Sequence, residues 1–67
     1  MENHNHNLVQ QLSESLDSLW RCGAYKKDAK KCAHCAKLWT TLESRFSGIV
    51  KMLEKEITNH VKDGSFS

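Results

Sequence analysis

The fold follows from one stretch of the chain, CAHCAKLWTTLESRFSGIVKML, residues 32–53. Its apolar positions are alternately three and four residues apart: Cys32, Cys35, Trp39, Leu42, Phe46, Ile49 and Leu53. This spacing keeps one narrow face of an α-helix apolar, as in a coiled coil. Val50, Ile57 and Val61 widen that face toward the carboxyl end. Because Lys62 and Gly64 form a helix-ending pattern, we predict a helix over residues 33–62.

A second apolar pattern lies upstream, at Val9, Leu12, Leu16 and Leu19 with Leu8 and Trp20 beside it. Asn7 and Gln10 have the spacing of a capping box, which predicts a helix start near residue 8. The chain contains no proline, and a helix ending before Gly23 would leave much of the other apolar face uncovered. We therefore expect this helix to continue through Gly23 to about residue 30.

Together these patterns predict an all-α protein, an antiparallel helical hairpin with helices at about 8–30 and 33–62 and a turn around Lys31 and Cys32. Residues 1–67 form one small domain, with frayed tails at 1–6 and 65–67. A hairpin covers only one flank of each apolar face, so we expect a homodimer that forms a four-helix bundle. The expected dimer core consists of Leu12, Leu16, Leu19, Trp39, Leu42, Phe46, Ile49 and Leu53.

Length and composition exclude several classes of protein. A chain of 67 residues is too short for a multidomain enzyme, and Leu, Ile, Val and Phe make up only 14 of them, so a metal or a partner chain is the expected support for so thin a core. No segment approaches the ~20 apolar residues of a membrane span. The amino terminus lacks the pattern of a signal peptide, so we expect a cytoplasmic protein. No nucleophile and base are arranged around a pocket, so we expect no enzyme.

The sharpest chemical signal is the CxxC pair, Cys32 and Cys35. Two thiols three residues apart can bind one metal ion, but structural zinc takes four ligands. Cys22, His34 or the pair of a second chain would have to complete a zinc site, and an iron–sulfur cluster has the same requirement. Alternatively, the pair is a redox dithiol whose thiolate is favoured by nearby lysines. The third interpretation is that both thiols, like Cys22, are small core residues.

Two further clusters are weaker signals. His4 and His6 return toward Glu56 and His60 at the open end of the hairpin, where these residue types could hold a transition metal, although a polar surface is the commoner role. Residues 21–37 carry six Lys and Arg against one Asp, and Lys26, Lys27, Lys30 and Lys31 are candidate contacts for an anionic partner. Charged turns are more often simply solvated, so nucleic acid is an unlikely partner.

From the sequence we expect a small interaction or regulatory protein that presents a dimeric helical surface to an unidentified protein partner. The alternative is a metal-binding or thiol-sensing module centred on Cys32 and Cys35, for which zinc and an iron–sulfur cluster are both candidates. Nucleic-acid binding through the basic turn ranks third.

Overall fold

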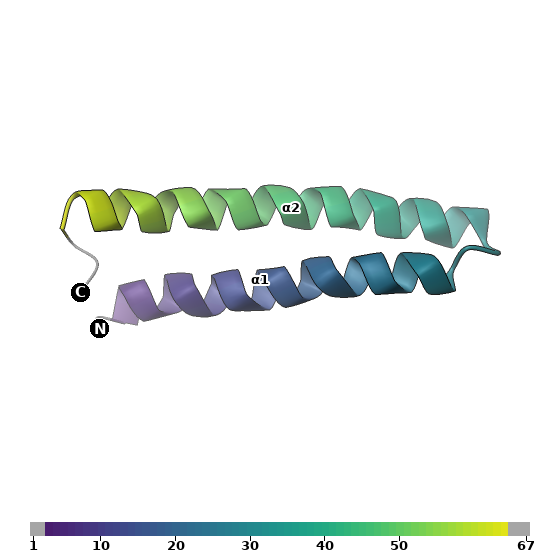
Figure 1. Ribbon diagram of the computed structural model, residues 1–67, viewed down its shortest axis with the longest axis horizontal. Helices are drawn as coiled ribbons and strands as arrows, with labels where there is room; N and C mark the ends of the chain where they lie inside the picture. Colours follow the sequence, from purple (N-terminus) through teal and green to yellow (C-terminus); the bar gives the residue numbers. More distant parts are fainter. Residues whose placement is uncertain (1–2, 65–67) are drawn as a thin grey trace.

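The computed structural model describes residues 3–64, which form two antiparallel helices lying side by side (Figure 1). Helix α1 spans Asn3–Asp28 and helix α2 spans Ala33–Lys62. The molecule is a rod of 49 × 15 × 12 Å. The prediction of an all-α hairpin is confirmed, as are the predicted bounds of the second helix.

Helix α1 begins earlier than its sequence pattern predicts. It starts at Asn3 rather than near residue 8 and ends at Asp28 rather than near residue 30, so the capping box at Asn7 is wrong. Of the predicted tail 1–6, residues 3–6 are helical, and the other tail positions, 1–2 and 65–67, lie outside the described residues. The added turn places His4 and Asn5 against His60 of α2, and these contacts favour the longer helix. Gly23 lies inside α1 as expected.

The turn between the helices is short and hydrogen-bonded. The backbone N–H of Cys32 donates to the carbonyl of Ala29 at 2.9 Å, and Cys32 itself is extended and caps α2. Lys26 and Lys27 lie in the last turn of α1, where cations interact favourably with the helix dipole. At the other end of α2, Gly64 takes a φ of 78°, the left-handed conformation that ends helices and that glycine adopts without strain.

The two helices contact each other through positions that repeat every three and four residues. The inner positions of α1 are Asn5, Leu8, Leu12, Ser15, Leu19, Cys22 and Lys26, followed by Ala29 in the turn, and those of α2 are Ala36, Trp39, Glu43, Phe46, Val50, Leu53, Ile57 and His60; all are buried or half-buried. Val9 and Leu16, which belong to the predicted apolar face of α1, are instead exposed by 40% and 45%. The inner face of α1 is therefore rotated from the most apolar face, and it includes polar and small side chains.

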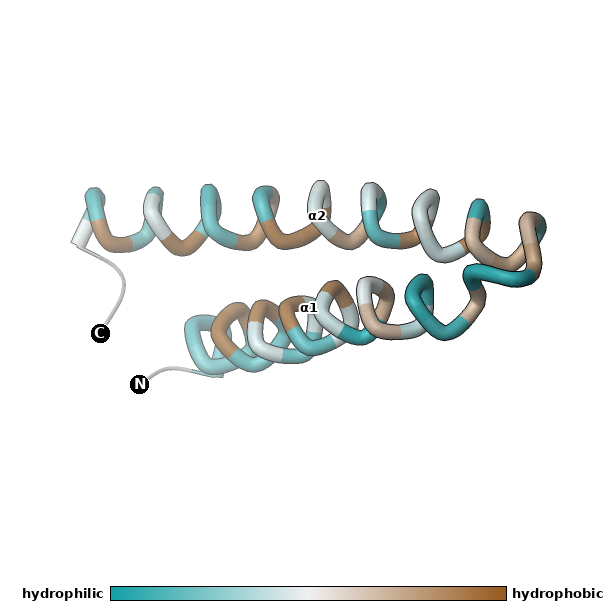
Figure 2. The backbone as a smooth tube through the Cα atoms, turned by 45° about the vertical axis from the view of Figure 1, so that its right-hand side comes forward, coloured by the Kyte–Doolittle hydropathy of each residue, from teal (hydrophilic) through white to brown (hydrophobic). Residues whose placement is uncertain are grey.

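Contacts between side chains define the register of the helices. The ring centroids of Tyr25 and Trp39 lie 4.9 Å apart near the turn. Nearby, Lys26 Nζ lies 3.4 Å from Glu43 Oε1. At the open end His4 lies beside His60. Figure 2 shows apolar residues along most of the side of α2 that faces α1, whereas the end of α1 near the turn is hydrophilic.

The core of a single hairpin is thin. Within residues 3–64, Cys22 and Val50 are the only hydrophobic side chains that are fully buried. Asn5 and Ser15 are the buried polar residues, and Gln11 donates a hydrogen bond of 3.2 Å to the Ser15 hydroxyl. Exposed large apolar side chains are more numerous: Val9, Leu16, Trp20, Tyr25, Leu38, Ile49, Met52 and Val61.

Candidate functional site

The CxxC pair lies at the start of α2, next to the turn. Cys32 is the N-cap residue, and its Sγ accepts a hydrogen bond of 3.4 Å from the backbone N–H of Cys35. The Sγ atoms of Cys32 and Cys35 lie 2.9 Å apart and share a hydrogen bond. Both thiols are free, with Cys32 half-buried and Cys35 exposed. The hairpin therefore does not bury this pair as core residues, in contrast to Cys22.

The two thiols differ in acidity because of their contacts. When Cys32 ionises, Cys35 is the sulfur that can donate to it, and this hydrogen bond lowers the pKa of Cys32 below its ordinary value. The backbone N–H of Cys35 lowers this pKa further, and that of His34 has a smaller effect. The same hydrogen bond, together with the negative charge on Cys32, raises the pKa of Cys35. The geometry thus makes Cys32 the more acidic thiol of the pair, and the causes are hydrogen bonds rather than the neighbouring lysines that sequence reasoning invoked.

The other predicted metal ligands do not join this pair. Cys22 is 3% exposed in the interface between the helices, and His34 is exposed. Among residues 3–64, no group of three or more His, Cys, Asp or Glu side chains is arranged to hold a metal ion. A four-ligand site built on Cys32 and Cys35 would therefore need donors from outside the described part of the chain.

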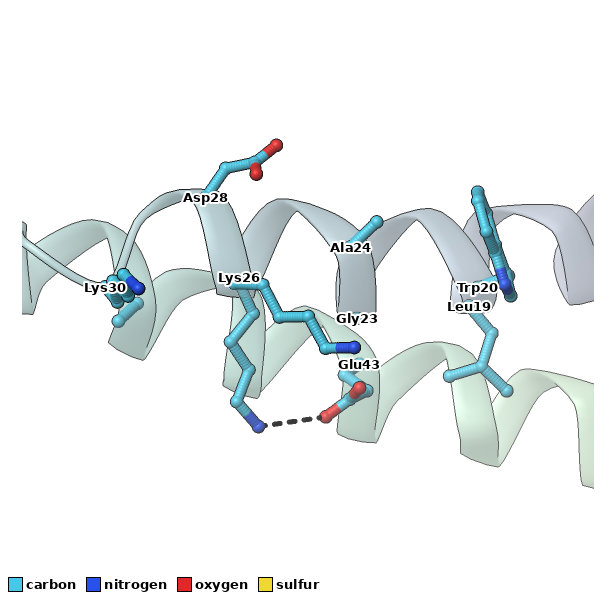
Figure 3. Close-up of a pocket in the computed structure, with 10 residues that line it drawn as sticks. Leu19, Trp20, Gly23, Ala24, Lys26, Asp28, Lys30 and Glu43 are labelled. Atoms are coloured by element: carbon cyan, nitrogen blue, oxygen red, sulfur yellow. Dashed lines mark hydrogen bonds and ion pairs between the residues drawn. The ribbon is translucent and has the colours of Figure 1, made fainter.

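The lysines near the turn have different environments. Lys26 pairs with Glu43, whereas Lys27, Lys30 and Lys31 are exposed. Beside this ion pair is an open groove of about 1100 Å³ (Figure 3). Its lining consists of Leu19, Trp20, Gly23, Ala24, Lys26, Lys27, Asp28, Lys30, Ala36 and Glu43. The groove is open at Gly23 because that residue has no side chain. Sequence reasoning missed Glu43, although its place in the three-and-four repeat beside Trp39 and Phe46 was a usable signal.

The exposed apolar side chains form two stripes, one on each helix. We call Val9, Leu16 and Trp20 the α1 flank, and Leu38, Leu42, Ile49 and Met52 the α2 flank. Of the α2 flank, Leu42 is half-buried and the other three are exposed.

These two flanks lie on opposite sides of the hairpin. If the inner positions of each helix are labelled a and d of a heptad repeat, Val9 and Leu16 of the α1 flank are e positions, and Leu42 and Ile49 of the α2 flank are g positions. In an antiparallel pair of helices, e positions lie beside e positions and g positions beside g positions. The contacts agree with this assignment. Gly23, an e position, lies against Glu43, whereas the ring of Tyr25, a g position, lies tilted against that of Trp39. A single flat partner surface cannot cover both stripes at once.

The predicted dimer-core residues are divided among these surfaces. Leu42 and Ile49 belong to the α2 flank, and Leu16 belongs to the α1 flank. The others, Leu12, Leu19, Trp39, Phe46 and Leu53, are half-buried between the two helices of the chain. Those five side chains already contribute to the hairpin itself.

At the open end of the rod, four residues come together. His4 Nε2 lies 3.4 Å from His60 Nε2, and Glu56 Oε2 lies 3.3 Å from the same His60 atom. Asn5, which is 1% exposed, accepts a hydrogen bond from His60 Nδ1 at 3.0 Å. Sequence reasoning brought His4 to Glu56 and His60 but missed Asn5, whose signal was its place in the repeat with Leu8 and Leu12.

No protein-family model matches this chain, and no curated protein and no solved structure matches it significantly. Within residues 3–64, neither helix has the combination of length and apolar character that crossing a membrane requires. The functional argument therefore depends on the geometry alone.

Proposed function

We propose that the chain is a small helical interaction protein that works as a homodimer and has no catalytic activity of its own. The observation that carries this proposal is the imbalance between eight exposed large apolar side chains and two buried ones in the described part of the chain. A core this small rarely supplies enough stability by itself. Two hairpins packed into a four-helix bundle would bury much of the remaining apolar surface.

We assign the dimer contact to the α2 flank. This stripe contains no lysine, although the exposed Arg45 lies at its centre between Leu42 and Ile49, and Tyr25 of α1 adds apolar surface on the same side. Met52, 72% exposed, has a flexible side chain that adapts to a partner surface. The α1 flank lies on the side of the hairpin that carries the polar positions Thr40 and Ser47 of α2. It remains accessible in the dimer for an amphipathic helix of a protein partner.

Two further parts of the proposal concern chemistry and location. The groove beside Gly23 is lined by lysines, apolar side chains and the carboxylates of Asp28 and Glu43, and its lining includes no serine, cysteine or histidine, which supports a role in binding rather than catalysis. Three free thiols are typical of a reducing compartment, and this supports a cytoplasmic location.

Matched pairs of charged substitutions test the dimer and its flank. The double variant Leu38→Glu and Met52→Glu changes exposed residues, so the hairpin should stay helical while the protein becomes monomeric at micromolar concentration. The control Leu16→Glu and Trp20→Glu changes the α1 flank and should leave the dimer intact. Sedimentation velocity with circular dichroism gives both readouts. Dissociation of the control alone would contradict the assignment to the α2 flank.

The short distance between Cys32 and Cys35 favours a second candidate function, a thiol–disulfide switch. The Cys32 thiolate would attack a small-molecule disulfide, forming a mixed disulfide and releasing one thiolate. Cys35 would then lose its proton and attack the sulfur of Cys32, releasing the second thiolate. The balanced result is one protein disulfide and two small thiols. A disulfide between Cys32 and Cys35 would link the N-cap residue of α2 to the first turn of that helix.

Equilibration in glutathione redox buffers tests this switch, with trapped thiols counted by mass spectrometry. The wild type should lose the mass of two hydrogen atoms as the disulfide between Cys32 and Cys35 forms, and regain it on reduction. Cys22→Ser should behave identically because Cys22 is buried. Mixed glutathione adducts without an internal disulfide would contradict the switch. Stoichiometric zinc shared by two chains, released by chelator with loss of helicity, would instead identify a metal site on four thiolates.

A further inference from the structure

The open end of the hairpin holds a pair of imidazoles contributed by both helices. His4 lies in the first turns of α1 and His60 in the last turns of α2, and their ring centroids are 4.8 Å apart. The His60 side chain is only 16% exposed, whereas His4 is exposed. These rings therefore join the start of α1 to the end of α2 at the end of the rod that lies farthest from the turn.

Asn5 orients the more buried imidazole. Its side-chain oxygen can only accept a hydrogen bond, so the 3.0 Å contact assigns the proton to His60 Nδ1. In a neutral imidazole this assignment leaves the lone pair on Nε2, the atom nearest to His4 and Glu56. Histidines that bind metals usually donate their other ring N–H to a fixed acceptor in this way. Asn5 is itself 1% exposed, so the acceptor is held in place.

The spacing of the two nitrogens fits a coordination sphere. Tetrahedral bonds of about 2.0–2.1 Å from zinc to imidazole nitrogen place neighbouring donor atoms about 3.3–3.4 Å apart. The two Nε2 atoms of His4 and His60 are 3.4 Å apart. The separation of the two nitrogens is therefore that of two neighbouring donors on one tetrahedral ion.

Glu56 supplies negative charge at the same point. Its Oε2 atom lies 3.3 Å from His60 Nε2 and its side chain is 50% exposed. The contact between His60 Nε2 and Glu56 is an ion pair when that nitrogen carries a proton, and a metal ion that binds Nε2 takes the place of the proton beside the carboxylate. Imidazole suits Zn²⁺, Ni²⁺ and Cu²⁺, whereas Mg²⁺ and Ca²⁺ prefer oxygen ligands.

We propose that His4 and His60 form a two-histidine chelate for a divalent transition-metal ion at the open end of the hairpin. Water completes the coordination, because residues 3–64 present no group of three or more suitable side chains. Glu56 supplies the nearby negative charge, and Asn5 fixes the tautomer of His60. A bound ion would join two residues that are 56 positions apart in the sequence. Because both ligands are in place only when the hairpin is folded, the ion stabilises the folded state.

The test uses the full-length chain with Cys32→Ser and Cys35→Ser, which removes competition by the thiols. Zinc chloride, and separately nickel chloride, are titrated by calorimetry, and thermal unfolding is followed by circular dichroism. We expect one ion per chain and a melting temperature that rises with metal concentration. His4→Gln, at an exposed position, should weaken binding at least ~10-fold. His6→Gln is the matched control and should bind as the parent does.

Several outcomes would overturn the proposal. Equal affinity in His4→Gln and His6→Gln would show that the ion binds elsewhere, and no binding by a helical parent at millimolar metal would exclude the chelate. Circular dichroism of each variant before metal is added verifies that the hairpin is folded. Imidazole resonances of His4 and His60 should shift together in NMR spectra during the titration, and shifts confined to other histidines would also contradict it.

Discussion

Lys26 and Glu43 form an ion pair between the two helices, with Nζ 3.4 Å from Oε1, at inner positions of both three-and-four repeats. Their side chains are 44% and 36% exposed, so solvent screens the attraction. The pair therefore contributes more to the register and orientation of the helices than to the free energy of folding.

A double-mutant cycle measures that contribution. With Lys26→Ala and Glu43→Ala, we expect a coupling free energy below about 1 kcal/mol that decreases at high salt. Urea unfolding at one fixed protein concentration provides the values. A coupling well above this range, insensitive to salt, would mean that the pair is shielded from solvent.

Alanine substitutions at two valines of α2 test which face of the helix forms the core. Val50 is 6% exposed and Val61 is 59% exposed. Val50→Ala should lower the free energy of unfolding by about 2 kcal/mol because it leaves a cavity between the helices. Val61→Ala should change it by less than about 0.5 kcal/mol. Similar losses at both positions, measured by urea unfolding, would mean that the inner face of α2 is wrongly assigned.

Glycines inside the helices are sites for stabilisation. A Cβ atom at Gly48 would meet nothing within 4 Å, and one at Gly23 would lie 3.4 Å from Glu43 Oε2. Since glycine is about 1 kcal/mol less favourable than alanine inside a helix, Gly48→Ala should raise the free energy of unfolding by about 0.5–1 kcal/mol. Gly23→Ala should raise it by no more than that. A thermal melt in which Gly48→Ala destabilises the protein would indicate that another surface packs at this position.

The acidity of the CxxC pair gives a prediction about pH. Because the pKa of Cys32 is lowered, its thiolate persists to lower pH than that of an ordinary cysteine, and Cys32 should react with iodoacetamide before Cys35. Cys35→Ala removes the largest cause of the shift, so the rate profile of Cys32 should move to higher pH. Peptide mapping identifies the alkylated residue. An unchanged profile in Cys35→Ala would contradict the assigned cause.

Much of this fold was predictable from the sequence, but the rotation of α1 was not. The wide apolar face of α2 and the Lys62–Gly64 ending predicted its bounds because both signals are local. In α1 the most apolar face includes Val9 and Leu16, yet the hairpin turns Asn5, Ser15 and Cys22 inward. Those residues share a three-and-four repeat with Leu8 and Leu12, but nothing within α1 shows that this face, rather than the more apolar one, packs against α2.

The candidate sites show the same division between local and distant information. The CxxC pair was visible in four consecutive residues, whereas the different acidities of Cys32 and Cys35 depend on the hydrogen bonds at the helix start. The sequence predicted that His4 returns toward His60, but the contact between their rings depends on α1 beginning at Asn3. A helix starting at residue 8 would have left His4 outside any defined geometry.

The central claim is that one hairpin is an incomplete unit which a second copy completes. Sedimentation equilibrium of the reduced, metal-free protein over a wide dilution range tests it directly. The account predicts a mass of twice 7.7 kDa at micromolar concentration, with helicity falling as dilution dissociates the pair. A fully helical and cooperatively folded species of 7.7 kDa at every concentration would contradict it.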